Sequence, residues 1–397
     1  MKGKTVLLGV TGSIAAYKTA NLASMLVKQG CDVHVLMTKN AVNFINPITF
    51  ETLTSHKCLI DTFDRNFQYH VEHVALAKRA DAVMIAPASA DVIAKLAHGI
   101  CDDMLTTTVL ACTCKKMVSP AMNTNMFQNP ITQDNLQLLR KYGFEVIEPA
   151  VGRLACNDVG AGKMPSEETL FSYLEREISH KKDMKGLKVL VTAGATCEDI
   201  DPVRYITNHS SGKMGYALAK NAMLRGAEVT LITGDATVAP PPFVKVISAI
   251  RAQEMFEAVK AHYSEQDIIL KAAAVADFRP KSVAQEKIKK TGAAMEIPLE
   301  KTDDILQWLG DHRKPEQYIC GFSMETEKLV EHSRQKLKKK KIDMIAANNL
   351  RVEGAGFQGD TNVVTLITAQ EELSLPLMSK DETAEKLLDF LLCQRKK

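Results

Sequence analysis

The chain has 397 residues, a length typical of two domains. Its 46% hydrophobic and 24% charged residues are the proportions of a soluble globular protein. Lysine and arginine total 50 against 47 aspartates and glutamates, a net charge of +3 that is too balanced to indicate a nucleic-acid-binding protein.

The nine cysteines are scattered without the spacing of a zinc site, and this pattern predicts a reducing, cytoplasmic location. The closest pair, Cys112 and Cys114, fits neither a zinc knuckle nor a thioredoxin-type motif. The N-terminal residues have the pattern of a short strand and not of a signal peptide. Because no apolar run approaches the length of a membrane span, we expect no membrane partner.

The first half of the chain begins with a strand–turn–helix–strand pattern. An apolar strand is predicted at residues 5–10, a helix at 14–29 and a second strand at 32–37. This order is typical of a doubly wound α/β sheet. The turn between the first strand and the helix lacks the glycine spacing of a dinucleotide fingerprint. Phosphate binding at the helix N-terminus and a plain tight turn both remain open.

Further strands are predicted at residues 83–87 and 117–120, each followed by polar residues where ligands bind in open α/β sheets. Asn123 could anchor a carboxylate, although the pattern alone favours a turn-forming asparagine. His73 shares a predicted helix face with His70, which is a weak signal for metal and is more often structural. The glycine-rich stretch 152–164 predicts a mobile flap or a close backbone approach, and its Cys156 is a reactive group or an ordinary surface cysteine.

Taken together, the motifs at 11–18, 73, 87–91, 120–126 and 152–164 resemble the flavin-dependent cysteine decarboxylases, specifically the phosphopantothenoylcysteine decarboxylases. The resemblance covers residues 1 to about 178 and departs from the family at Phe127 and Asn157. It implies FMN as cofactor and His73, Asn123 and Cys156 as catalytic residues. It also implies the following FMN-binding and substrate-binding positions: Gly12, Ser13, Ile14, Thr38 and Ser89 for the flavin, and Met122 and Met126 for the substrate.

The second half begins with a buried strand at 189–193, followed by a long polar loop that ends at a helix start, Ser210-Ser211-Gly212. A polar loop of that length in an α/β domain indicates function. Strands and helices are then predicted in the following order: strands 229–233, 244–247, 268–273, 318–321, 344–346 and 363–367, with helices 215–225, 251–263, 304–310 and 327–340. The last strands are expected to extend the sheet in antiparallel fashion.

Lysines recur at 287–290 and 336–341, where they form solvated surfaces or a clamp for a polyphosphate. Lys213 lacks the spacing of a P-loop, which we therefore reject. Asp277, at the end of a predicted strand, could hold a base, a ribose or a metal ion.

The motifs at 201–215, 272–278, 286–290 and 334–336 resemble the phosphopantothenate–cysteine ligases from about residue 187 onward. The resemblance implies CTP as the nucleotide, activated with Mg²⁺, and leaves the metal ligands unknown. Asn208 corresponds to the family's acyl-intermediate position, Lys287 to a catalytic and nucleotide-binding position and Arg204 to a substrate position. The remaining implied nucleotide contacts are these: Asp277, Asp303, Asp304, Ile305, Leu306, Phe322, Lys336 and Lys340. Thr302 and Asp303 depart from relatives that have proline before the aspartate.

The fused order is similar to that of the bacterial bifunctional enzymes of coenzyme A synthesis. We expect two doubly wound, Rossmann-like α/β domains: a flavodoxin-like decarboxylase at 1–180, a linker at 181–186 and a ligase at 187–397. The implied substrates are 4′-phosphopantothenate, cysteine and CTP. The resemblance further implies trimeric decarboxylase contacts and dimeric ligase contacts, which together would build a dodecamer.

Two other functions compete with this interpretation. A non-catalytic flavoprotein module should lack one of His73, Asn123 and Cys156, and this chain has all three. A nicotinamide-dependent dehydrogenase is disfavoured by the missing dinucleotide fingerprint in both halves.

Overall fold

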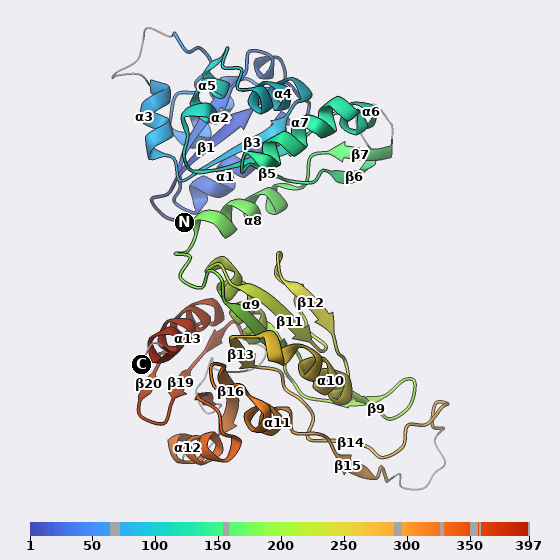
Figure 1. Cartoon of the computed structure of the whole chain (residues 1–397). Helices are drawn as coiled ribbons and strands as arrows, with labels where there is room; N and C mark the ends of the chain where they lie inside the picture. The colour runs from blue at the N-terminus through green and yellow to red at the C-terminus, as the bar shows by residue number, and fades with distance from the viewer. Residues whose placement is uncertain are drawn as a thin grey trace. The chain divides into compact units, whose positions relative to one another are not determined.

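The computed structural model describes residues 1–63, 72–153, 159–289, 296–325, 329–349, 356 and 359–395 (Figure 1). The chain divides into two compact units, Met1–His180 and Lys181–Lys397.

Within its described residues, the first unit is built on a five-stranded parallel sheet in the spatial order β2-β1-β3-β4-β5. The strands are β1 (Thr5–Val10), β2 (Asp32–Met37), β3 (Ala82–Ala88), β4 (Lys115–Pro120) and β5 (Glu145–Val146). This is the flavodoxin-like strand order, in which the direction of winding reverses between β1 and β3. It confirms the fold predicted for this half of the chain.

Helices cover both faces of this sheet (Figure 1). One face packs on α1 (Ala16–Lys28), α2 (Pro47–Thr54) and α8 (Glu167–Ile178). The other face packs on α3 (Glu72–Arg79), α4 (Ala90–His98), α5 (Met104–Ala111) and α7 (Pro130–Lys141). Beyond β4 lie the short α6 (Thr124–Gln128) and an antiparallel hairpin of β6 (Ala150–Arg153) and β7 (Val159–Lys163); a 3-10 turn, η1 (Ala41–Asn43), follows β2. Because β1 and β3 are buried on both faces, their sequences are continuously apolar.

The described part of the second unit contains an eight-stranded sheet in the order β12-β11-β8-β13-β16-β17-β19-β20. Its strands are β8 (Lys188–Ala193), β11 (Glu228–Thr233), β12 (Lys245–Ser248), β13 (Ile268–Lys271), β16 (Tyr318–Glu325), β17 (Met344–Asn349), β19 (Val364–Ile367) and β20 (Glu372–Ser374). The strands from β12 to β17 are parallel and wind in the doubly wound Rossmann order, which reverses between β8 and β13. β19 and β20 are antiparallel, as predicted.

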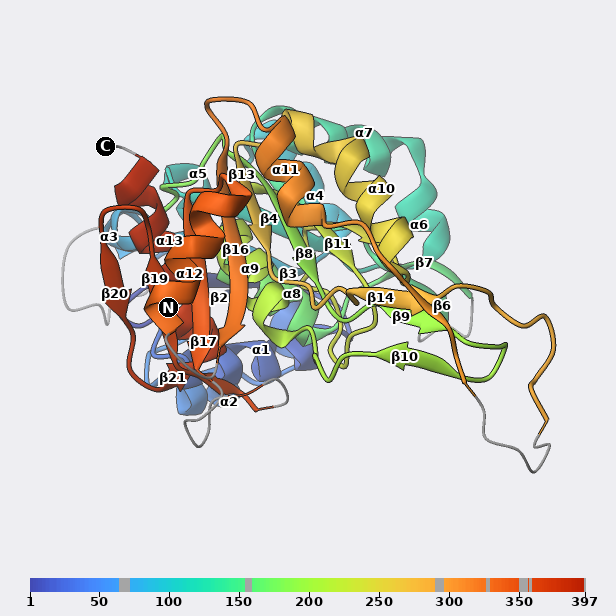
Figure 2. The ribbon, with the colours of Figure 1, turned by 90° about the horizontal axis from the view of Figure 1, so that it is seen from below.

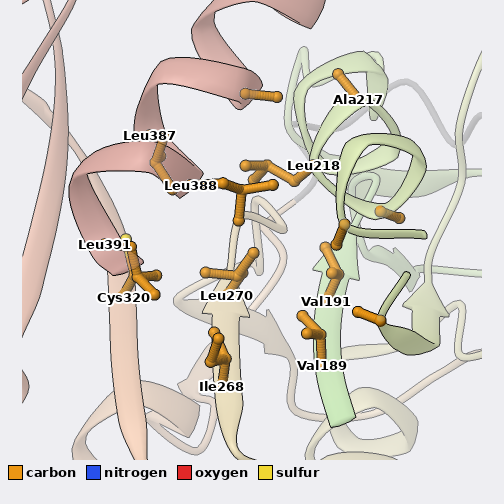
Figure 3. Packing of buried hydrophobic residues seen from close by; sticks show 14 of the residues in the cluster. Val189, Val191, Ala217, Leu218, Ile268, Leu270, Cys320, Leu387, Leu388 and Leu391 are labelled. Atoms are coloured by element: carbon orange, nitrogen blue, oxygen red, sulfur yellow. The ribbon is translucent and has the colours of Figure 1, made fainter. Parts of the chain in front are cut away.

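The core of the second unit lies on both faces of this sheet. One face packs on α9 (Lys213–Leu224) and α13 (Lys380–Arg395), and the other on α10 (Ala252–His262), α11 (Ile305–His312) and α12 (Leu329–Lys340). Figure 3 shows the first of these layers, where leucines of α13 meet strand residues such as Leu270 and Cys320. The remaining elements are a 3-10 turn, η2 (Tyr263–Glu265), and the short paired strands β18 (Thr361–Asn362) and β21 (Met378–Ser379).

Two short strand pairs extend away from the main sheet of the second unit, as both views show (Figures 1 and 2). They are β9 (Cys197–Asp199) with β10 (Tyr205–Thr207), and β14 (Phe278–Pro280) with β15 (Leu299–Lys301). We call these strands and the described residues 281–289 the hairpin arm. The predicted polar loop after β8 therefore contains a hairpin, in which β9 and β10 pair in antiparallel fashion.

α13 was not predicted from the sequence, although its buried Ala384, Leu387, Leu388 and Leu391 have helical spacing. We predict that Leu388→Ala lowers the free energy of unfolding of the second unit by ~2–5 kcal/mol, because Leu388 is fully buried and its truncation leaves a cavity. The measurement is a urea titration followed by the fluorescence of Trp308, the single tryptophan of the chain. Leu377→Ala is the control, since that side chain is 51% exposed. Equal midpoints for the two variants would contradict the packing.

Candidate functional sites at the carboxyl edges of the two sheets

In the first unit, the loops that leave β1 and β3 are joined by one buried hydroxyl. Thr11, which is fully buried, donates from Oγ1 to the carbonyl of Pro87 at 2.7 Å. The same oxygen accepts the backbone N–H of Ser89 at 2.9 Å. The Thr11 side chain thus fixes both sides of the point where the winding reverses, and ligands bind at such points in open α/β sheets.

The loop after β2 lies against the same turn. A Cβ atom on Gly12 would approach the Cβ of Asn40 to 2.8 Å, so the turn requires glycine there. Thr38 is buried and its N–H donates to the carbonyl of Val10 at 3.0 Å. Ser13 and Ile14 lead into α1, and the side chain of Ile14 is 60% exposed. The predicted flavin positions Gly12, Ser13, Ile14, Thr38 and Ser89 therefore come from three loops along one edge.

The loop after β4 carries Asn123 to this edge. The Asn123 side chain caps α6, with Oδ1 accepting the N–H of Asn125 at 2.8 Å. Met122 donates its N–H to the carbonyl of Gly162 in β7 at 3.1 Å. Gly162 has a φ of +127°, and a Cβ there would lie 2.3 Å from the Met122 carbonyl oxygen. Glycine thus allows the β6–β7 hairpin to pack directly on the Asn123 loop, while Met126 in α6 is half exposed.

The other two predicted catalytic residues are placed less completely. His73 is half-buried in the first turn of α3. Since α3 leads directly into β3, its first turn points toward the edge at which the parallel strands end. Cys156 lies outside the described residues; the paired residues of the β6–β7 hairpin that precede and follow its segment are Arg153 and Val159.

In the second unit, a pocket of about 500 Å³ opens beside the ends of β13 and β16. We call it the acid–lysine pocket. It brings together these predicted nucleotide positions: Asp277, Asp303, Asp304, Ile305, Leu306, Phe322, Lys336 and Lys340. Its other lining residues include Lys271, Thr302 and Lys301.

Lysines and aspartates face one another inside this pocket. Lys340 forms an ion pair with Asp304. Although burial opposes the effect, the hydrogen bond from Lys340 leaves the pKa of the Asp304 carboxyl below its usual value. Burial lowers the pKa of Lys271 to about 8; the charge of Lys336 also lowers this pKa, whereas Asp304 and Asp277 raise it. This pocket suits an anionic ligand, because the negative charge of the ligand can pair with the lysines.

Lys271 is a pocket residue that was not predicted from the sequence. Its ammonium donates to the carbonyl of Ala273 at 3.3 Å, just beyond the end of β13. The sequence feature that could have identified it is a single charged residue inside the apolar run 268–273. A lysine in a buried strand needs a polar environment, which the pocket provides.

A second, smaller pocket of about 150 Å³ adjoins the first, and Phe322 lines both. The start of α9 lines it with Ser210, Ser211 and Gly212. Gly212 has a φ of +76°, and a Cβ there would lie 3.3 Å from the Cα of Gly194, so the turn requires glycine. Asn208 donates from Nδ2 to the carbonyl of Ala274 at 3.1 Å, which places it beside this serine–glycine pocket.

Arg204 and Lys287 belong instead to the hairpin arm. Asp201 is buried and accepts hydrogen bonds from the Arg204 side chain and from the N–H of Ile288 at 3.1 Å. The Arg204 hydrogen bond holds the pKa of Asp201 far below its usual value. Lys287 is exposed and lines neither pocket. The structure thus gathers most predicted nucleotide positions but leaves Lys287 on the arm.

Known proteins of similar sequence identify the family of this chain. Residues 1–179 match a family model described as flavoprotein, and residues 184–393 match the C-terminal domain of DNA/pantothenate metabolism flavoproteins. The coenzyme A biosynthesis bifunctional protein CoaBC of Vibrio vulnificus (strain CMCP6) is 43% identical, over 98% of this chain and 97% of its own. CoaBC of Bacillus subtilis (strain 168) is 42% identical, over 98% and 96%. The chain belongs to this family.

Membership confirms the predicted family, fold class and dual activity. The chain is a bifunctional enzyme of coenzyme A biosynthesis that combines a phosphopantothenoylcysteine decarboxylase with a phosphopantothenate–cysteine ligase. A crystal structure of a CoaBC C-terminal domain is also similar, with 42% identity, coverage of 53% of this chain and 98% of that one, and a TM-score of 0.46. Among the described residues, no helix is both long and apolar enough to cross a membrane.

Proposed function

We propose that residues 1–180 form the FMN-dependent decarboxylase, residues 187–397 the CTP-dependent ligase, and residues 181–186 the linker. The two compact units and the two family matches support a division near residue 180. Residues 181–186 pack with the second unit, where Met184 is buried and Asp183 forms an ion pair with Arg225. The ligase step comes first, because it makes the cysteine amide that the decarboxylase then uses.

The carboxyl edge of the first sheet fits a flavin phosphate. The start of α1 follows Ser13, and a helix N-terminus attracts anions through its N–H groups and its dipole. Ser89 contributes a hydroxyl beside the same turn, and the exposed Ile14 offers apolar cover for a ring. When bound, FMN supplies the reversible two-electron oxidation that gives the cysteine carboxylate an electron sink.

The chain's own residues then hold the substrate and move protons. Asn123 anchors the carboxylate of the substrate through its amide donor, and Met122 and Met126 line the pantothenoyl path. His73 acts as base or orienting group for the oxidation step. Cys156 donates a proton to the enethiolate that remains after carbon dioxide leaves.

We predict that His73→Asn keeps the bound-flavin absorption spectrum but abolishes carbon dioxide release, because the flavin positions lie on other loops.

We predict that Cys156→Ser still releases carbon dioxide yet fails to form the normal aminothiol and leaves the flavin reduced. The measurements are carbon dioxide release, product analysis and the flavin spectrum under anaerobic single turnover. Wild-type rates of aminothiol formation in both variants would show that the decarboxylase residues are assigned wrongly.

For the ligase, the observation that carries the proposal is the acid–lysine pocket beside the carboxyl ends of β13 and β16. The carboxylate of 4′-phosphopantothenate attacks the α-phosphorus of CTP, and pyrophosphate leaves. The amine of cysteine then attacks the acyl carbon, and CMP leaves. Lys336 and Lys340 suit the polyphosphate because an ammonium is a mobile point charge, and Asn208 suits the acyl carbonyl because an amide donates without a charge.

Carboxylates of the same pocket suit Mg²⁺, which prefers oxygen ligands and is usually bound by one or two carboxylates together with substrate phosphates. Asp277, Asp303 and Asp304 are the oxygen donors that line it, and Asp304 already binds Lys340. We therefore assign Mg²⁺ to the bound nucleotide with help from this pocket, and the individual ligands stay open.

Lys287 and Arg204 are held together on the hairpin arm by Asp201 and Ile288. Because Lys287 lines neither pocket, we propose that it reaches the nucleotide of a second copy in the predicted ligase dimer. The dimeric and trimeric contacts, the resulting dodecamer and the cytoplasmic location stay predictions.

We predict that Lys287→Gln fails at pyrophosphate release, whereas Asn208→Asp forms acyl-cytidylate but processes it poorly. Loss of a positioned donor typically lowers a rate by ~100- to 1,000-fold. The measurement is a single-turnover assay with phosphopantothenate and either CTP or ATP, with and without cysteine. Wild-type pyrophosphate release and amide formation in both variants would place the ligase site elsewhere, and equal rates with ATP would overturn the choice of CTP.

Action of Lys287 across the dimer can be tested by complementation. Co-expression of Lys287→Gln with Asn208→Asp should restore part of the activity, since one pocket of a mixed dimer then has both intact groups. Absence of any recovery in purified mixed dimers would contradict action across the dimer.

We predict that Lys271 makes CTP binding weaken as pH rises through about 8. Burial disfavours the charged lysine in the empty pocket, and a bound polyphosphate favours it, so binding takes up a proton near that pH. The dissociation constant should rise by up to ~10-fold per pH unit above about pH 8. Calorimetric titrations of CTP from about pH 7 to about pH 9 test this. Lys271→Met should flatten the dependence, and Lys338→Met, an exposed lysine of α12 outside the pocket, should not.

A further inference from the structure

Two histidines and an aspartate converge at the opposite edge of the first sheet, where β2 begins. Asp32 is the first residue of β2, and His34 lies on the same face of the strand because side chains alternate. His56 follows the end of α2, where its N–H donates to Oγ1 of Thr54 at 3.3 Å. Neither proposed activity uses any of these three side chains.

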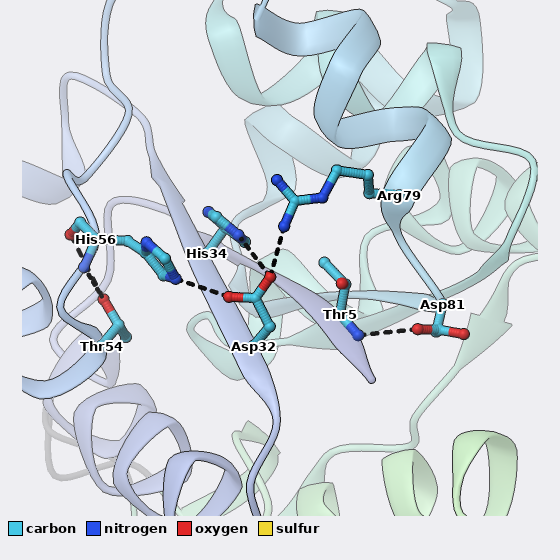
Figure 4. Close-up of polar contacts among 7 residues, drawn as sticks. All are labelled: Thr5, Asp32, His34, Thr54, His56, Arg79 and Asp81. Carbon is cyan, nitrogen blue, oxygen red and sulfur yellow. Dashed lines mark hydrogen bonds and ion pairs between the residues drawn. The ribbon is translucent and has the colours of Figure 1, made fainter. Parts of the chain in front are cut away.

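Both imidazole rings point one nitrogen at the same carboxylate (Figure 4). Nε2 of His56 lies 2.7 Å from Oδ1 of Asp32, and Nε2 of His34 lies 3.2 Å from Oδ2. The two rings are stacked, with centroids 4.1 Å apart and planes inclined by 17°. One ligand atom of each residue lies within 4.8 Å of the others. Stacking thus holds two nitrogen donors side by side over one carboxylate.

We propose that Asp32, His34 and His56 bind a divalent transition-metal ion, with Zn²⁺ as the best match, at a site separate from both candidate active sites. Imidazole nitrogen with carboxylate oxygen is a ligand set that suits Zn²⁺. Ligand atoms about 2.0–2.1 Å from a tetrahedral zinc ion lie about 3.3 Å from one another. The observed nitrogen-to-oxygen separations of 2.7 and 3.2 Å are close to this value. Because each Nε2 lone pair lies in the plane of its ring, one ring has to turn out of the stack to coordinate, and the 39% exposed His56 has room to do so.

The proton balance of this step is simple. Without metal, each neutral imidazole carries its proton on Nε2 and donates it to Asp32. On binding, both rings become Nδ1–H tautomers and coordinate through Nε2, while the carboxylate coordinates through oxygen. Side-chain exposures of 11% for His34 and 39% for His56 leave an opening for a water as fourth ligand.

Arg79 is the group that opposes this site. Its guanidinium donates to Oδ2 of Asp32 at 2.8 Å, and its positive charge repels a second cation. The Arg79 side chain is 59% exposed, so it can turn into solvent and release the carboxylate. An ionised carboxylate also has further lone pairs on both oxygens. We therefore expect Arg79 to weaken metal binding without preventing it.

Loss of a ligand and loss of Arg79 should therefore change zinc affinity in opposite directions. The experiment is equilibrium dialysis of the untagged, full-length, flavin-loaded protein against buffered free Zn²⁺, with metal analysis of the protein. We expect a zinc ion in the wild type that is lost in His34→Gln and in His56→Gln. Affinity should fall by more than ~100-fold in each, because even outer-shell partners of metal ligands change affinity by ~10–100-fold. Arg79→Met should bind zinc more tightly than the wild type.

Controls separate this site from others. His312→Gln changes an exposed histidine of the second unit and should leave zinc uptake unchanged. All variants keep the nine cysteines, so uptake by thiols is common to all of them. Added zinc should also raise the temperature at which flavin is released from the wild type and from Arg79→Met, but not from the ligand variants. Equal zinc affinity in the wild type, His34→Gln and His56→Gln, or weaker binding by Arg79→Met, would overturn the proposal.

Discussion

The reversal of winding in each parallel sheet is the constraint on which both candidate sites depend. Where neighbouring strands lead to helices on opposite faces, their loops separate and leave a crevice at the carboxyl edge. In the first sheet this happens between β1 and β3, where Thr11 joins the two loops through one buried hydroxyl. In the second sheet it happens between β8 and β13, and both pockets lie at that end of β13. The same backbone geometry thus underlies both candidate sites.

The two crevices differ in how they treat charge. In the first unit, backbone groups at the start of α1 and uncharged side chains surround the proposed flavin position. In the second, Lys271, Lys336 and Lys340 face Asp277 and Asp304 across one pocket. A triphosphate requires several positive charges, and crowding them without an anion would destabilise the fold. The ion pair of Lys340 with Asp304 offsets part of the repulsion among these lysines.

The sequence predicted the strand-and-helix order well because buried parallel strands are continuously apolar. β1 and β2 were predicted with the boundaries that the structure has. The hairpin of β9 and β10 was missed because each strand has only three residues and neither contains an apolar run. Lys271 was missed for a different reason, since burial of a lysine depends on the neighbouring β16 and α12 and not on its own segment. Family motifs, and not spacing alone, pointed to Asn208 and Lys287.

The opposite edge of the first sheet follows a different logic. At the carboxyl edge, glycines such as Gly12 and Gly162 remove side chains so that backbones can approach one another. At the start of β2, large side chains converge instead, and Asp32 accepts from His34, His56 and Arg79 together. A carboxylate with three such donors is strongly stabilised in its charged form, and its pKa is lowered even though burial opposes this. Removal of the guanidinium would leave two imidazoles on one anion, which is the arrangement that a zinc ion completes.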